Sequence, residues 1–368
     1  GLDSYASLRM AHLGPEVPTG LTQTWNGQWT KGAGAEYDVA TTAKVKKIQG
    51  DKVRHFKAAE LAKVTNNLGA SSSNKTGALL PLGVFPDDIV FSSPIEQKLT
   101  GARTLYLSTS EKIQWTFDFE QHAGVDAEGF PIIDAYYTLG NPQTFKAGQS
   151  YTKTFNTAVF GPHINKDFGL FREGNDIYGF LPLFADGSKH AGSSEFSAVS
   201  TSLYRNGTRL ATNDDPLFGE QMFRVPAGDA EYKLTTSVKR SVKVAAASTR
   251  IDASWTFRSK KSTADRVTLP ASTVRFDAKT GLDSRVEADK KVTFPVTVVG
   301  SAAGANLKSL HVYVSYDYGQ TWKKLEVKDG KITVKNPAKG KAISFHAKVA
   351  DKKGNKATVS IYNAYYGK

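Results

Sequence analysis

Alternation of apolar and polar residues is the clearest pattern in this chain. In the segment Ser248–Ser259 every second residue is apolar, and the residues between are charged or carry hydroxyls. The apolar positions are Ile251, Ala253, Trp255 and Phe257. This pattern predicts a β-strand with one buried face and one solvent-exposed face. The tripeptide Trp-Thr-Phe recurs at Trp115–Phe117, inside a second alternating segment, so we expect two similar core strands.

Short strand candidates separated by turn residues recur from Ala78 to Ser259, at the spacing of a β-sandwich or jelly roll. Asn206-Gly207 predicts a hairpin with a type I′ turn. One short helix is predicted over Lys57–Leu68, because apolar residues lie at helical spacing and a glycine follows as its cap. Residues 1–95 are predicted to be an irregular N-terminal extension that includes a strand near Glu36–Lys47.

A polar connector, Ser259–Asp265, precedes the last part of the chain. Residues 269–368 hold six to seven strand candidates in about a hundred residues, which is typical of an immunoglobulin-like or fibronectin-like sandwich. The predicted fold is therefore all-β: a large β-sandwich or jelly-roll-like domain over residues 1–268, followed by a smaller Ig/fibronectin-like β-sandwich over residues 269–368.

Composition narrows the possible chemistry. The chain has 368 residues, 40% of them hydrophobic and 23% charged, which indicates a globular protein. It has no cysteine, which excludes disulfides, cysteine–zinc sites and thiol chemistry. No apolar run is long enough to span a bilayer. The chain starts at Gly1 without a signal-peptide pattern, so we expect a piece of a longer protein.

The net charge of +13 is concentrated near the C-terminus. Residues 271–368 carry 18 Lys and Arg against 8 Asp and Glu, whereas the first 270 residues carry 30 against 27. Such a basic module could attract polyanions, or its lysines could simply keep a β surface solvated. The lysines do not follow a groove-reading helix, so nucleic acid is not an expected partner.

Two groups of residues are candidates for binding. Trp25, Trp29 and Tyr316 are candidate ligand-surface aromatics, although tryptophans in such segments more often cover a core. Asp126, Glu128, Asp214 and Asp215 lie in oxygen-rich loops that could hold Ca²⁺, with turn capping as the alternative. Apart from this Ca²⁺ candidate, no cofactor is predicted.

The segment Ser315-Tyr-Asp-Tyr-Gly-Gln-Thr-Trp322 matches the Asp-box turn of sialidase-like propellers. In that turn Asp317 bonds turn amides, Gly319 takes a positive φ and Trp322 packs beneath. One copy does not make a propeller, so the motif is interpreted as a stabilised turn. The seven histidines are scattered and show no metal-ligand spacing.

Several blocks together resemble one family. They are Phe184–His190, Leu203–Gly207, Pro226–Leu234, Ser248–Ser259, Leu269–Phe276 and Val314–Trp322. In this order they are similar to the C-terminal, non-catalytic region of secreted subtilisin-like (S8) serine peptidases of actinobacteria. The family's catalytic motifs are absent from this chain, so no catalytic residue is carried over. The resemblance implies an extracellular accessory region whose Ser-His-Asp machinery lies upstream of Gly1.

Three functional hypotheses follow. In the first, the chain supports the upstream catalytic domain and positions protein substrate or an anionic cell-wall polymer. In the second, it is a stand-alone extracellular module that binds carbohydrate or polyanions. In the third, it is an independent hydrolase that uses scattered carboxylates, which would have to lie as a pair at a fixed separation.

Overall fold

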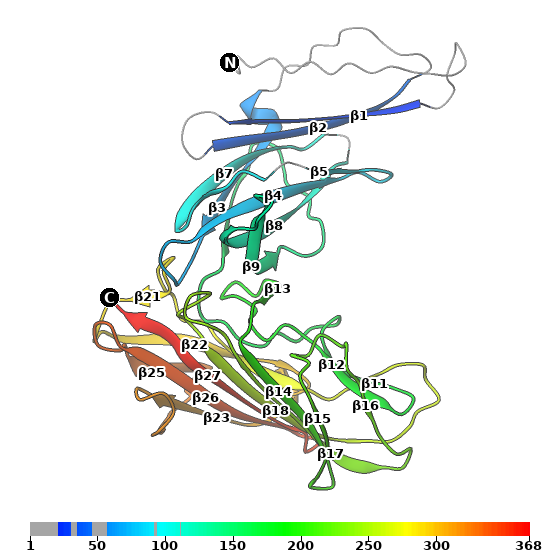
Figure 1. The fold of residues 1–368 in the computed structure, drawn as a ribbon, viewed down its shortest axis with the longest axis vertical. Helices are drawn as coiled ribbons and strands as arrows, with labels where there is room; N and C mark the ends of the chain where they lie inside the picture. Colours follow the sequence, from blue (N-terminus) through cyan, green and yellow to red (C-terminus); the bar gives the residue numbers. More distant parts are fainter. Residues whose placement is uncertain (1–20, 31–34, 46–56, 92–93, 111) are drawn as a thin grey trace. The chain divides into compact units, whose positions relative to one another are not determined.

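The computed structural model describes residues 21–30, 35–45, 57–91, 94–110 and 112–368, with only the backbone described for Ala58 and the strands before it. These residues form strands and two short 3₁₀ turns, Ala58–Glu60 and Gly304–Asn306 (Figure 1). The predicted all-β fold class is confirmed. None of the helical turns in these ranges has the length or apolar character to cross a membrane.

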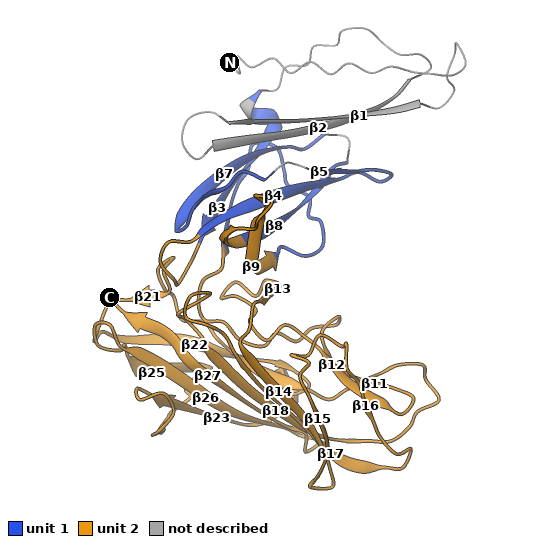
Figure 2. Cartoon of the chain, viewed as in Figure 1, with its two compact units in different colours: residues 1–68, 76–120, 138–154 blue, residues 69–75, 121–137, 155–368 orange. Residues whose placement is uncertain are grey.

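The chain divides into two compact units, each assembled from separate stretches of sequence (Figure 2). Unit 1 contains Gly1–Leu68, Thr76–Glu120 and Thr138–Thr154. Unit 2 contains Gly69–Lys75, Gln121–Tyr137 and Phe155–Lys368. The long strands β8 (Gln114–Val125) and β9 (Pro131–Thr138) each begin in one unit and end in the other.

Unit 1 is built around a sheet with the strand order β1-β2-β7-β3-β10. These strands are β1 (Leu21–Thr30), β2 (Ala35–Val45), β7 (Gly101–Ser108), β3 (Leu61–Leu68) and β10 (Ser150–Phe155). The strand β4 (Thr76–Val84) pairs with β5 (Ile89–Phe91) and β6 (Gln97–Lys98). Trp115, Phe117 and Phe119 are buried on β8, as the alternating pattern predicts.

The helix predicted over Lys57–Leu68 is wrong, because this segment forms a single 3₁₀ turn followed by strand β3. Val64 and Leu68 are four residues apart, a spacing that suits one face of a helix and one face of a strand equally. The residue between them, Asn66, is fully buried, and its side-chain amide donates to the carbonyls of Val64 and Arg103. A buried asparagine in the apolar series therefore hid the period of two.

The irregular N-terminal extension predicted for residues 1–95 is corrected where the structure describes them, and its residues 1–20, 31–34, 46–56 and 92–93 lie outside the described ranges. Strands β1 and β2 pair antiparallel from Leu21↔Val45 to Thr30↔Glu36, and β3, β4 and β5 follow within the same range. The strand predicted at Glu36–Lys47 corresponds to β2. Leu21, Trp25 and Trp29 fall at alternate positions of β1, but Gln23 and Gly27 interrupt the apolar series, which weakens the period of two.

Unit 2 is organised by one long sheet with the strand order β15-β14-β17-β18-β27-β26-β23-β24. The first half consists of β15 (Thr208–Asn213), β14 (Ala198–Arg205), β17 (Ala230–Lys239) and β18 (Arg250–Ser259). The second half consists of β27 (Lys356–Gly367), β26 (Ala342–Asp351), β23 (Leu307–Ser315) and β24 (Lys323–Leu325). Strand β21 (Arg285–Val286) adds a short parallel pairing to β27.

The remaining strands of unit 2 form smaller sheets. One has the order β16-β12-β11-β19, built from β16 (Phe223–Arg224), β12 (Asp176–Phe180), β11 (Gly169–Glu173) and β19 (Val267–Leu269). Another has the order β20-β22-β25, built from β20 (Ser272–Phe276), β22 (Lys291–Gly300) and β25 (Lys331–Lys335). Strand β13 (Ala191–Ser194) neighbours β9.

The predicted fibronectin-like sandwich is present in residues 272–367. The sheet β20-β22-β25 packs against the half-sheet β27-β26-β23-β24, which gives the three-plus-four strand arrangement of such folds. Phe345 of β26 lies at the centre of this core. Its ring stacks on Phe276 at 4.7 Å and meets Phe294 edge-on at 6.0 Å.

The structure differs from the predicted domain boundary at residue 268. Strand β18 pairs along its length with β27, from Arg250↔Tyr362 to Thr256↔Lys356, so residues on both sides of the boundary share one sheet. Residues 155–368 accordingly belong to one compact unit. The predicted polar connector, Ser259–Asp265, contains a loop, but this loop does not separate two domains.

Two local predictions in unit 2 are confirmed. Ile251, Ala253, Trp255 and Phe257 are all buried on β18. The hairpin between β14 and β15 turns at Asn206 and Gly207, with φ of 49° and 82°. Both values are positive, as a type I′ turn requires.

Candidate functional site

The long sheet of unit 2 has one face in the core and one face toward solvent, which we call the outer face. Alternation places Arg250 of β18 on the outer face beside Tyr362 of β27. In the next row, strand register places Asp252, Ser360, His346, Tyr313 and Lys324 side by side. Residues on five neighbouring strands therefore meet on one surface.

Aromatic rings form a continuous line on this surface, which we call the aromatic row. It consists of Tyr313, His346, Trp322, Tyr362 and Tyr318. Successive ring centroids lie 5.7, 5.6, 6.3 and 5.0 Å apart. Tyr318 is 43% exposed and the other four are half-buried, so the row presents ring surface while its rings support one another.

The Asp-box turn supplies two members of the aromatic row. Asp317 accepts hydrogen bonds from the backbone N–H of Thr321 at 2.9 Å and from the hydroxyl of Ser315 at 2.7 Å. Gly319 has a φ of +77°, and a Cβ there would lie 2.7 Å from a ring carbon of Tyr362. The turn thus needs glycine for both conformation and space, and it fixes Tyr318 and Trp322 against β27.

Cations flank the aromatic row. The guanidinium of Arg250 lies 4.9 Å from the Tyr362 ring centroid and bonds Asp252 at 2.9 Å, a bond that raises the pKa of Arg250. The ammonium of Lys348 lies 5.5 Å from the Tyr313 ring centroid. Burial, reinforced by Lys348, lowers the pKa of His346, so this ring is neutral at pH 7.

A line of hydroxyls runs across the outer face next to the aromatic row, and we call it the hydroxyl row. Register places its members on five adjacent strands: Thr212, Ser202, Thr235, Ser254 and Thr358. Ser202 and Thr212 share a hydrogen bond of 2.7 Å, and Ser254 and Thr358 share one of 2.5 Å. Lys348, opposite Thr358, joins the end of the hydroxyl row to the aromatic row.

The three aromatic residues predicted as ligand-surface candidates lie in different parts of the chain. Tyr316 is 49% exposed beside the Asp-box turn, and its hydroxyl donates to the Lys335 carbonyl. Trp25 and Trp29 lie in β1, whose side chains are outside the described residues. Sequence reasoning missed Tyr313, His346 and Tyr362, although each stands at an outward position of a strand with a clear apolar face.

Of the four candidate calcium ligands, Asp126 and Asp215 cap turns. Asp126 accepts hydrogen bonds from the backbone N–H groups of Glu128 and Phe130, both at 2.9 Å. Asp215 is buried and accepts three backbone N–H bonds at 2.8 to 3.0 Å, and Asp214 accepts one from the Gln221 side chain. Within the described ranges, no three acidic or histidine side chains gather closely enough to hold a metal ion.

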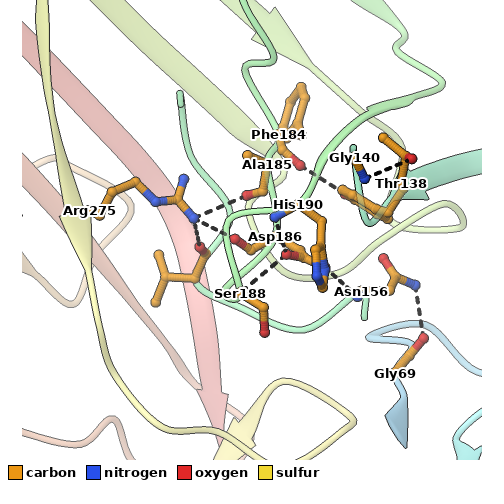
Figure 3. A network of polar contacts seen from close by, with 12 residues as sticks. Gly69, Thr138, Gly140, Asn156, Phe184, Ala185, Asp186, Ser188, His190 and Arg275 are labelled. Carbon is orange, nitrogen blue, oxygen red and sulfur yellow. Dashed lines mark hydrogen bonds and ion pairs between the residues drawn. The ribbon is translucent and has the colours of Figure 1, made fainter. Parts of the chain in front are cut away.

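A second polar constellation is buried in unit 2 and centres on Asp186 (Figure 3). Its carboxylate lies 3.0 Å from Nδ1 of His190, a pairing also found in acid–base sites. The same carboxylate accepts backbone N–H bonds from Asn156, Ser188 and His190 at 2.9 to 3.1 Å. Asp186 is fully buried, and the three backbone N–H groups that donate to its carboxylate hold the turn together.

Further buried groups join this turn to distant segments. Asn156 donates to the Gln121 side chain and to the Gly69 carbonyl, and Gln121 donates to Asp134, which also pairs with Lys75. Arg275 donates to the backbone carbonyls of Ala185 and Asp186 (Figure 3). It also donates to the carbonyl of Gly161. Burial lowers the pKa of Arg275 to about 10, so it stays cationic at neutral pH.

His163, also in unit 2, should make stability depend on pH. Burial, with Arg275 and Lys189 nearby, lowers the pKa of His163 to about 4, below the value of 6.5 for a free side chain. Between these values the unfolded chain binds the proton more readily, so the free energy of unfolding should fall as pH drops from 6.5 toward 4. Urea unfolding across this range should show a smaller fall for His163→Phe. Parallel curves for both proteins would contradict this assignment.

Comparison with known proteins adds little to this geometry. No protein-family model matches the chain. No curated protein matches it either. Solved structures similar to it include three N-terminal domains of the outer capsid protein Hoc of bacteriophage RB49, with 11% identity over 79% of this chain and 92% of that one. Extracellular domains 3–5 of Drosophila OTK have 10% identity over 82% and 96%, and the insect immune protein hemolin has 12% over 79% and 71%.

The TM-score is 0.17 in all three cases, so these likenesses carry no conclusion about this chain. Its all-β fold is established by its own strands and sheets.

Proposed function

We propose that this chain is the non-catalytic accessory region of a secreted subtilisin-like serine peptidase, and that it holds the enzyme to a polymer through the outer face. The aromatic row is the observation that carries the binding role. Partly exposed rings beside cations are the groups that contribute most to recognition, because they offer large contact area at small entropic cost. Five such rings on rigid strands and one braced turn make a preorganised surface.

The resemblance to peptidase accessory regions supports the first half of the proposal. The six sequence blocks that carry it form structural parts of unit 2: the Asp186 turn, the β14–β15 hairpin, the turn before β17, strand β18, strand β20 and the Asp-box turn. A chain of this kind would support a catalytic domain and position its protein substrate, with no cofactor required for either task.

A stand-alone extracellular module that binds carbohydrate or polyanions is the second candidate. The aromatic row serves this function equally well. The two candidates differ in what precedes Gly1, and an in-frame Asp, His and Gly-Thr-Ser set upstream would decide for the peptidase.

Removing the central ring should weaken polymer binding strongly. We expect the full chain to sediment with insoluble polysaccharide or cell-wall preparations, and Trp322→Ala to weaken this binding by about tenfold or more. Phe130→Ala is the matched control, because Phe130 is 66% exposed and distant in sequence from the aromatic row. The isolated chain should not cleave casein. Sedimentation by Trp322→Ala at the wild-type level, or reproducible casein cleavage, would refute the proposal.

A further inference from the structure

We infer that the polymer bound by the outer face is an anionic polysaccharide, which lies across the aromatic row and along the hydroxyl row. This inference rests on the proposed binding function and specifies its ligand. A sugar ring presents an apolar C–H surface and a rim of hydroxyls. The aromatic row matches the first of these, and the neighbouring serines and threonines match the second.

The chemistry of the outer face favours a sugar polymer over an acidic peptide. Extended peptides usually bind by adding a strand to a sheet edge, where backbone N–H and C=O groups are free. Strands β18, β27, β26 and β23 all lie inside the sheet with neighbours on both sides, so their outer face offers side chains alone. Ser254 and Thr358 share one hydrogen bond, so one of their two hydroxyl protons and the remaining lone pairs are left to bond sugar hydroxyls.

Charge on the outer face favours an acidic polymer over a neutral one. Lys324, Lys348 and Lys356 are exposed there, and none forms an ion pair within the described residues. The carboxylate of Asp252, in the middle of the face, is paired with Arg250. The face therefore presents uncompensated positive charge beside rings and hydroxyls, within a C-terminal segment that carries 18 cations against 8 anions.

The test compares a polysaccharide that has free carboxylates with the same polysaccharide after its carboxylates are methyl-esterified. Polygalacturonate, its fully methyl-esterified form and poly-glutamate are titrated against the full chain by calorimetry, at about 0.05 M and about 0.5 M salt. We expect polygalacturonate to bind best and to bind about tenfold more weakly at the higher salt. Lys348→Gln should weaken its binding about fivefold and change binding of the ester little, because the charge is lost while the aromatic rings remain.

Two variants keep the test specific. Lys331→Gln is the matched control for charge, because Lys331 is exposed on β25, in the other layer of the sandwich. Tyr318→Ser removes an exposed ring and should weaken binding of both forms of the polymer. The melting temperature of each variant verifies folding.

The outcomes distinguish the anionic assignment of the ligand from the proposed polymer-binding function. Equal affinity for the free and esterified polymers would overturn the anionic assignment and leave the binding function standing. Tight binding of poly-glutamate that is unaffected by Trp322→Ala or Tyr318→Ser would also overturn it, since lysines alone would then explain the attraction. Failure to bind any polysaccharide would overturn both the inference and the proposed function.

Discussion

Replacing Trp255 by alanine should lower the free energy of unfolding of unit 2 by about 3–5 kcal/mol, as truncation of large buried aromatics does. Trp255 is 1% exposed, and its indole N–H donates to the Ser272 carbonyl at 2.8 Å. That bond ties β18 to β20, so the variant leaves a cavity and an unpaired carbonyl where the two sheets meet. Chemical unfolding followed by circular dichroism measures the loss.

Two control variants separate the contributions at this position. Trp255→Phe keeps most of the volume and loses the indole bond, so we expect a loss of about 1–2 kcal/mol. Arg258→Ala lies on the same strand with its side chain in solvent, so it should change stability little. If Trp255→Ala unfolded like the wild type, the assignment of this strand to the core would be wrong.

Replacing Asp186 by alanine should cost about 3–5 kcal/mol, the usual loss when one partner of a buried polar network is removed. Three backbone N–H groups, of Asn156, Ser188 and His190, would lose their acceptor in a site closed to water. The same turn supplies carbonyls to Arg275, so the variant also loosens the contacts of a buried cation.

The matched control for Asp186 is a carboxylate whose partner is in solvent. Asp229→Ala removes the surface pair with Arg258 and should change stability little. Asp186→Asn retains one acceptor oxygen and should lie between the alanine variant and the wild type. Equal losses for Asp186→Ala and Asp229→Ala, measured by urea unfolding, would show that the turn does not depend on its buried carboxylate.

Much of the fold could be predicted from local sequence. Wherever apolar residues alternate without interruption, as at Trp255, the strand and its buried face follow directly. The residue types at Asn206-Gly207 and in the Asp-box turn at Asp317 also predict the backbone conformation of those turns. Even the repeated Trp-Thr-Phe has a shared role, because the indole of Trp115 donates to a serine carbonyl just as that of Trp255 does.

The parts that could not be predicted depend on pairing between distant segments. The aromatic row needs the register of β23, β26 and β27, which places Tyr313 beside His346, and it needs Trp322, which contacts both His346 and Tyr362. No single segment contains that information. The turn at Asp186 likewise takes a backbone donor from Asn156, thirty residues earlier in the chain. The helix prediction at Val64 failed because one buried asparagine broke the apolar pattern.

The interleaving of the two units has a consequence for how the chain is made. Gly69–Lys75 and Gln121–Tyr137 are synthesised early, yet they belong to the unit whose remaining residues begin at Phe155 and extend to Lys368. Lys75 and Asp134 can pair as soon as both have emerged, but Gln121 must wait for Asn156 and for the Val244 carbonyl. Folding of unit 2 therefore needs segments that are spread from Gly69 to Lys368, which is typical of slowly folding proteins with high contact order.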